Sequence, residues 1–175
     1  LAVAPKNVFL HANRAGRLGG ALLRAETSDT DVQFEDWHLR REQGSAGEVY
    51  TGRFAGEGFA VSFDASAAQP ALLRGQEGFS SKGPEALQAS HYYSRAPLGV
   101  KADVTVGKET QKLVGKAWLD HEWSSQLMMA GAVGWDWVGI NLLDGGTLMA
   151  FQILNATAAA LYAHVAARDA PGRPA

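Results

Sequence analysis

The segment GKAWLDHEWSSQLMMAGAVGWDWVGINLLDGGTLMAF (residues 115–151) decides how the rest of the chain is interpreted. It contains every tryptophan of the chain except Trp37, together with one histidine and several acidic residues, in an otherwise apolar stretch. Side chains alternate between the two faces of a β-strand. Two strands, 115–123 and 134–142, would therefore each present one apolar face, and the loop 124–133 would join them.

The alternation predicts that His121 and Asp136 enter the same interior. His121 and Trp123 lie on the apolar face of the first strand, and Asp136 lies on the aliphatic face of the second. A buried carboxyl group favours its neutral form. Such an acid can protonate an alkene or a carbonyl group while an imidazole positions or deprotonates water. The alternative is a hydrogen-bonded pair that holds two strands in register.

Aromatic residues accompany this pair. Trp123, Trp135 and Trp137 could form a wall that stabilises a cationic intermediate or stacks on an isoprenoid, although large aromatic side chains also fill cores. Tyr92 and Tyr93 are neighbours on a strand, so one would line the pocket and the other would lie at its rim. Tyr92, Tyr93, Trp135 and Trp137 are candidate binding residues, and Trp123 is a candidate catalytic residue with His121 and Asp136.

Composition excludes several classes of protein. The 175 residues include 16 basic and 18 acidic ones, so there is no basic surface for nucleic acid. The absence of cysteine removes disulfides, thiolate metal sites and a cysteine nucleophile. Residues 120–122, Asp-His-Glu, point alternately to opposite faces and cannot converge on one ion. We therefore expect no metal and no cofactor, and no apolar run is long enough to span a membrane.

The distribution of glycine and apolar residues indicates an all-β protein. The chain has 20 glycines and no sustained helical periodicity, which favours short strands joined by turns. Hairpins are expected over residues 48–65 and 100–114, and a long ordered loop or lid over 69–90. About eight to ten antiparallel strands suggest a closed barrel or a sandwich, and a barrel of that size can hold one small ligand.

Three motifs in order, LLRGQEGFSSKGPEALQASHYYS, GKAWLDHEWSS and GWDWVGINLLDGGTLMAF, resemble the bacterial AttH/CrtC-like group. This group includes proteins called predicted secreted hydrolases and the carotenoid 1,2-hydratases. The resemblance implies a lipocalin-like antiparallel β-barrel, usually two in tandem. We therefore expect residues 1–175 to be a single, partial first barrel, which lacks N-terminal strands and the second lipocalin-like domain.

The resemblance also implies a mechanism and a location. In the hydratase branch the acting residues include a histidine two positions before a tryptophan and a downstream aspartate, which correspond to His121, Trp123 and Asp136. The name of the group implies a periplasmic or secreted protein. No Gly-x-Ser-x-Gly motif is present, so serine hydrolysis is not expected.

The sequence thus predicts a barrel that binds a hydrophobic, isoprenoid or lipid-like molecule and performs acid-assisted chemistry of the hydratase (hydro-lyase) type. One alternative is a non-catalytic carrier or binding protein of the cell envelope, in which His121 and Asp136 only anchor the ligand or the strands. Another is an interaction module whose interior is filled by its own side chains. A connected cavity that reaches both residues would favour the enzyme.

Overall fold

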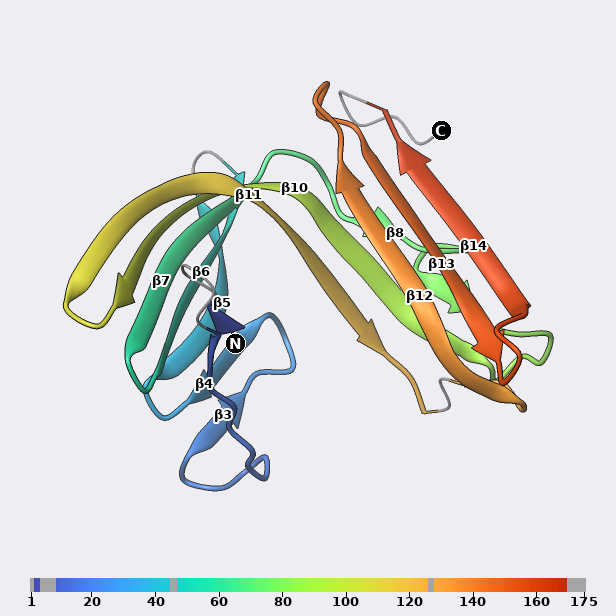
Figure 1. Cartoon of the computed structure of the whole chain (residues 1–175), viewed down its shortest axis with the longest axis horizontal. Coiled ribbons are helices and arrows are strands. Elements are labelled where there is room, and N and C mark those ends of the chain that lie inside the picture. Colours follow the sequence, from blue (N-terminus) through green and yellow to red (C-terminus); the bar gives the residue numbers. More distant parts are fainter. Residues whose placement is uncertain (1, 4–8, 45–46, 126–127, 170–175) are drawn as a thin grey trace. The chain divides into compact units, whose positions relative to one another are not determined.

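The computed structural model describes residues 2–3, 9–44, 47–125 and 128–169 (Figure 1). In these residues all regular structure is β-strand, and no helix is formed. The all-β class expected from the sequence is confirmed. The strands are β1 (Ala2–Val3), β2 (Leu10–His11), β3 (Leu23–Ala25), β4 (Asp31–Phe34), β5 (Trp37–Gly44), β6 (Gly47–Gly56), β7 (Phe59–Ala67), β8 (Leu72–Leu73), β9 (Phe79–Ser81), β10 (Ala89–Val106), β11 (Glu109–Trp123), β12 (Ala132–Asn141), β13 (Thr147–Asn155) and β14 (Ala160–Arg168).

The strands pair in three antiparallel sheets. The largest follows the order β11-β10-β7-β6-β5-β4-β3, with β8 and β9 also paired to β10. A second sheet has the order β12-β13-β14, and β1 pairs with β2. The closed barrel is not confirmed. In the part of the chain that the structure describes, β3 and β11 are the two edge strands of the large sheet and do not pair with each other.

Two compact units divide the chain. Unit 1 contains residues 1–68 and 99–115, and unit 2 contains residues 69–98 and 116–175. Each of the long strands β10 and β11 has one part in unit 1 and the other part in unit 2 (Figure 1). The sequence predicts a single domain over residues 1–175. This stays a prediction, because a division into compact units does not measure whether each unit folds on its own.

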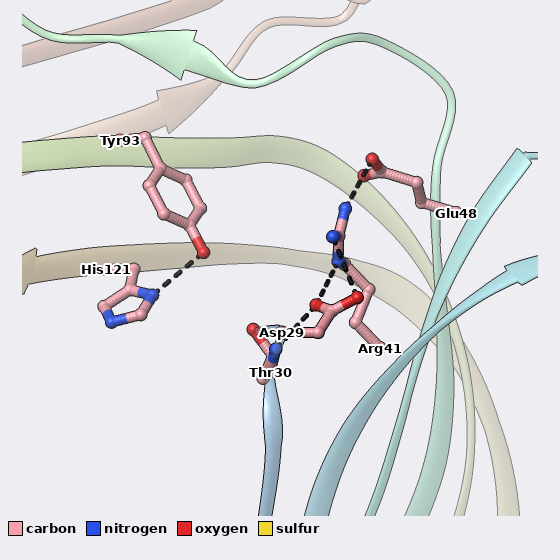
Figure 2. Close-up of polar contacts among 6 residues, drawn as sticks. All are labelled: Asp29, Thr30, Arg41, Glu48, Tyr93 and His121. Carbon is pink, nitrogen blue, oxygen red and sulfur yellow. Dashed lines mark hydrogen bonds and ion pairs between the residues drawn. The ribbon is translucent and has the colours of Figure 1, made fainter. Parts of the chain in front are cut away.

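Unit 1 is built on successive hairpins. The β6–β7 hairpin, predicted from the sequence, pairs Gly56 with Phe59 at its tip. Arg41 in β5 supports this meander through hydrogen bonds of 2.6 and 2.9 Å to the Asp29 carboxylate and one of 2.8 Å to Glu48 (Figure 2). These bonds, led by those to Asp29, raise the pKa of Arg41. The guanidinium therefore links the segment before β4 to both β5 and β6.

Unit 2 packs strand β13 against the side chain of Tyr92. The buried side chains alternate along β13, at Met149, Phe151 and Ile153, and they form one apolar cluster with Tyr92. Both neighbours of β13 pair with it over most of its length, so its central position explains this burial. The unit's core therefore lies on one face of the β12-β13-β14 sheet.

The segment 69–90, predicted to be a long loop or lid, carries two short strands. Both β8 and β9 pair with β10, so the segment is fixed along the sheet rather than free of it. Its turn depends on Gly75, which has a φ of 62° and lies close to the backbone of Phe79. Only glycine adopts this conformation without steric cost. No helix in the described residues is long and apolar enough to cross a membrane.

Candidate functional site

The candidate site is a pocket of about 110 Å³ in unit 2. Aromatic and aliphatic side chains form most of its wall, and one lysine and one glutamate supply the charges. The lining residues are Lys82, Tyr92, Glu122, Met128, Trp135, Trp137, Phe151 and Ile153. Two larger hollows of about 600 and 620 Å³ lie on unit 1. Their walls include exposed groups such as Lys112, whose side chain is 87% exposed, so they enclose a ligand less well.

Strand register places the aromatic wall. Trp137 pairs with Phe151 and Trp135 pairs with Ile153, so the four side chains project from one face of β12 and β13. Trp137 Nε1 donates a hydrogen bond of 3.1 Å to the Tyr92 hydroxyl oxygen. Trp135 is 62% exposed, which means that the pocket opens to solvent at the edge strand β12.

Lys82 is the buried cation of the pocket. Its side chain is 6% exposed, and its Nζ lies 4.1 Å from the Phe151 ring centroid and 4.7 Å from that of Tyr92. Nζ donates hydrogen bonds to Glu122 Oε1 at 2.9 Å and to Ser80 Oγ at 3.2 Å. Burial lowers the pKa of Lys82, and the bond to Glu122 opposes that shift.

A hydrogen-bonded chain connects Arg74 to Asp120 near Tyr92. Arg74 is completely buried and donates a 2.9 Å hydrogen bond from Nη2 to Ser94 Oγ. Ser94 in turn donates a 2.5 Å bond to Asp120 Oδ1, which also accepts one of 2.7 Å from Trp118 Nε1. Burial raises the pKa of Tyr92, and the charge of Asp120 adds to this effect. The phenol thus remains neutral, although charged side chains lie on both sides of it.

His121 and Trp123 do not enter this pocket, contrary to the sequence prediction. Both are exposed, on the other face of β11. Figure 2 shows the Tyr93 hydroxyl directed at His121 Nδ1, at 2.9 Å. The ring of Trp123 lies 5.0 Å from that of His121 and 5.3 Å from that of His91. These four residues form an outward-facing cluster, which we call the imidazole cluster.

Asp136 also differs in placement from the sequence prediction. It is exposed, and its Oδ2 accepts a 2.8 Å hydrogen bond from Gln152 Nε2 on the outward face of the β12-β13 pair. The reason is that β12 is an edge strand whose aliphatic face is not the buried one. The other face carries Trp135 and Trp137, which line the pocket, so the carboxylate stays hydrated. His121 and Asp136 therefore have no common partner among these contacts.

Of the expected binding residues, Tyr92, Trp135 and Trp137 line the pocket, and Tyr93 belongs to the imidazole cluster. Sequence reasoning missed Lys82 and Glu122. Glu122 lies on the charged face of β11 and its partner Lys82 lies in the 69–90 segment, a pairing that strand alternation alone does not reveal. No group of metal-binding side chains occurs within the described ranges, and the absence of a metal stays a prediction.

Comparisons with known proteins place the sequence among relatives. A family model described as AttH-like matches residues 1–175. No curated protein matches the chain. A crystal structure from Nitrosomonas europaea, of a protein described as a candidate AttH, has 43% sequence identity and a TM-score of 0.78. The match covers 86% of this chain and 46% of that chain, so this chain spans less than half of the neighbour's length.

Proposed function

This chain belongs to the AttH-like family, and on that basis we propose that it binds an apolar small molecule, of isoprenoid or lipid type, in the pocket of unit 2. The observation that carries the proposal is the aromatic wall around a buried lysine. Ligand pockets are typically apolar with a few convergent polar groups that fix orientation. This pocket has that composition.

The size of the pocket limits the ligand. A cavity of about 110 Å³ is somewhat smaller than the engineered cavities of roughly 150 Å³ that hold one benzene. One ring, or one branched isoprenoid end group, therefore fills it and stays partly exposed beside Trp135, where the pocket opens to solvent. A longer chain would extend past Trp135 toward solvent.

The charged pair defines the polar end of the ligand. Lys82 and Glu122 lie side by side in the wall, one as a donor and the other as an acceptor. A hydroxyl or carbonyl oxygen can accept from Lys82, and a hydroxyl can also donate to Glu122. We expect a neutral ligand with one such oxygen, because an anion would displace Glu122 and leave its charge without its partner.

Benzyl alcohol is a suitable probe, since it combines one ring with one hydroxyl. Binding is measured by saturation-transfer NMR, with the free protein as reference. We expect Trp135→Ala to weaken binding about fivefold to tenfold, or roughly 1 kcal/mol, because it removes one aromatic contact. Trp123→Ala is the matched control, because Trp123 is 51% exposed and lies outside the pocket. Weaker binding in the control alone would move the ligand to the imidazole cluster and refute the proposal.

Hydratase-type chemistry is a second candidate function. The observation that favours it is the imidazole cluster, in which Tyr93 holds the His121 ring beside Trp123. There His121 would pass a proton to an isoprenoid alkene and take one from the adding water, and Trp123 would stabilise the developing positive charge. The test is the addition of one water to a prenyl alkene, followed by mass spectrometry. Activity that survives in His121→Asn would exclude this role.

The cellular setting is also part of the proposal. A periplasmic or secreted location follows from the resemblance to predicted secreted hydrolases. A second lipocalin-like domain as partner is supported by the length of the neighbouring structure, of which this chain spans 46%. Cell fractionation of the native protein tests the first, and sequencing of the full gene tests the second.

A further inference from the structure

We propose that Lys82 captures an aldehyde or ketone ligand as a reversible imine in the pocket of unit 2. The inference goes beyond binding, because it assigns a covalent step to a residue of the wall. It rests on the proposed function in one respect, namely that the pocket admits a small apolar molecule.

The surroundings of Lys82 are those of a reactive amine. Lysines that form imines are typically desolvated in apolar pockets or lie near another cation. Here Nζ lies over the rings of Phe151 and Tyr92, and the side chain is almost completely buried. Nζ nevertheless belongs to a residue that lines the pocket, so a carbonyl carbon can reach it.

Burial, rather than the neighbouring charges, favours the neutral amine of Lys82. Burial is the main cause of the lowered pKa of Lys82, and the positive charge of Arg74 contributes in the same direction. Glu122 and Asp120 on β11 act in the opposite direction and are outweighed. His164 on β14 also interacts with Lys82, and burial lowers the pKa of this histidine, which keeps it neutral.

The Lys82–Glu122 contact supplies the proton transfers. The ammonium passes one proton to Glu122 Oε1, 2.9 Å away, and the neutral amine attacks the carbonyl carbon. Glu122 returns the proton to the former carbonyl oxygen as the C–N bond forms. Glu122 then takes a proton from the nitrogen and gives it to the hydroxyl, which leaves as water while the freed nitrogen lone pair forms the C=N bond. Amine and carbonyl thus give imine and water, and hydrolysis reverses the step.

A purely structural role for Lys82 predicts something different. In that case Nζ would remain the protonated partner of Glu122 and would react no faster than other lysines. Lys112 is the internal reference, because its side chain is 87% exposed and contacts only Asp103 among the contacts of the described residues. Both lysines are compared in the same molecule, so a folding defect cannot mimic the result.

The experiment uses benzaldehyde with sodium cyanoborohydride near neutral pH. Reduction of the imine leaves a benzyl group, a mass gain equal to the aldehyde less one oxygen atom. Peptide mapping then gives the extent of reaction at each lysine. We expect Lys82 to react at least about tenfold faster than Lys112, because the pocket holds the carbonyl carbon beside Nζ. Glu122→Gln should slow Lys82 and leave Lys112 unchanged.

Benzyl alcohol separates this inference from the proposed function. If it binds and protects Lys82 from benzaldehyde, the pocket and the imine are both supported. If it binds but Lys82 reacts no faster than Lys112, the imine is refuted and the pocket stands. If benzyl alcohol does not bind and Lys82 reacts only like Lys112, both proposals fail. Lys82→Arg should abolish the fast reaction, and its persistence at another residue would also refute the inference.

Discussion

Replacing Gly75 by alanine should destabilise unit 2 far more than the same change at Gly78. Both glycines have positive φ, 62° and 94°. A Cβ at Gly75 would overlap the carbonyl oxygen of Phe79 and lie 3.0 Å from the Cα of Ser80. A Cβ at Gly78 would meet nothing closer than 3.9 Å. Both variants carry the cost of a left-handed backbone, and only Gly75→Ala adds steric overlap. The difference between their stabilities therefore measures the cost of the overlap.

The magnitudes follow from this difference. A left-handed alanine costs about 1–2 kcal/mol, which is the whole expected effect of Gly78→Ala. Gly75→Ala adds the displacement of backbone at Phe79 and Ser80, similar to overpacking at about 1–3 kcal/mol. The total for Gly75→Ala is about 2–5 kcal/mol. Because Lys82 follows this turn, the change should also weaken benzyl alcohol binding.

Urea denaturation measures both variants against the wild type. With an m-value of about 2 kcal/mol per molar, a gap of 2 kcal/mol separates the midpoints by about 1 M. Equal midpoints for the two variants would refute the steric argument. A larger loss at Gly78 would mean that the turn is held by φ alone. Unchanged m-values are required for either conclusion.

The remaining predictions concern the buried charges. Asp120→Asn should cost about 1–3 kcal/mol, since it leaves the fully buried Arg74 cation without the nearby carboxylate charge; Arg74→Met in the same background should restore part of the loss, and a double-mutant cycle by urea denaturation checks this. The lowered pKa of His164 means that the unfolded chain takes up a proton first as pH falls. Stability should therefore decrease below about pH 6.5, the usual histidine value, and His164→Gln should flatten that decrease in thermal melts at several pH values.

The strand content and the hairpins could be predicted from the sequence because they depend on local signals. Glycine-containing turns and period-two alternation fix where a strand begins and ends, and the β6–β7 hairpin follows them. The class of the fold needs no more than this. Sheet closure depends instead on contacts between distant strands, which alternation does not specify.

The faces of β11 and β12 could not be assigned correctly from alternation. The face of β11 with Asp120 and Glu122 looks polar in isolation, yet it contributes Glu122 to the pocket, where the carboxylate pairs with Lys82 from a segment that precedes it by about 40 residues. In β12, one face carries the indoles of Trp135 and Trp137, and the other carries aliphatic side chains together with Asp136. A rule that buries the more uniformly apolar face fails in both strands.

The alternation in β11 also constrains how the gene can change in length. If one residue were lost or gained between Gly107 and Trp118, each later side chain of β11 would move to the opposite face of the strand. An insertion of one residue would place His121, and a deletion would place Trp123, where Glu122 lies beside Lys82, so Lys82 would lose its carboxylate. A change of two residues keeps the parity of the strand. Descendants of this chain should therefore vary here in even steps, and a frame-preserving single-codon deletion should abolish the pocket.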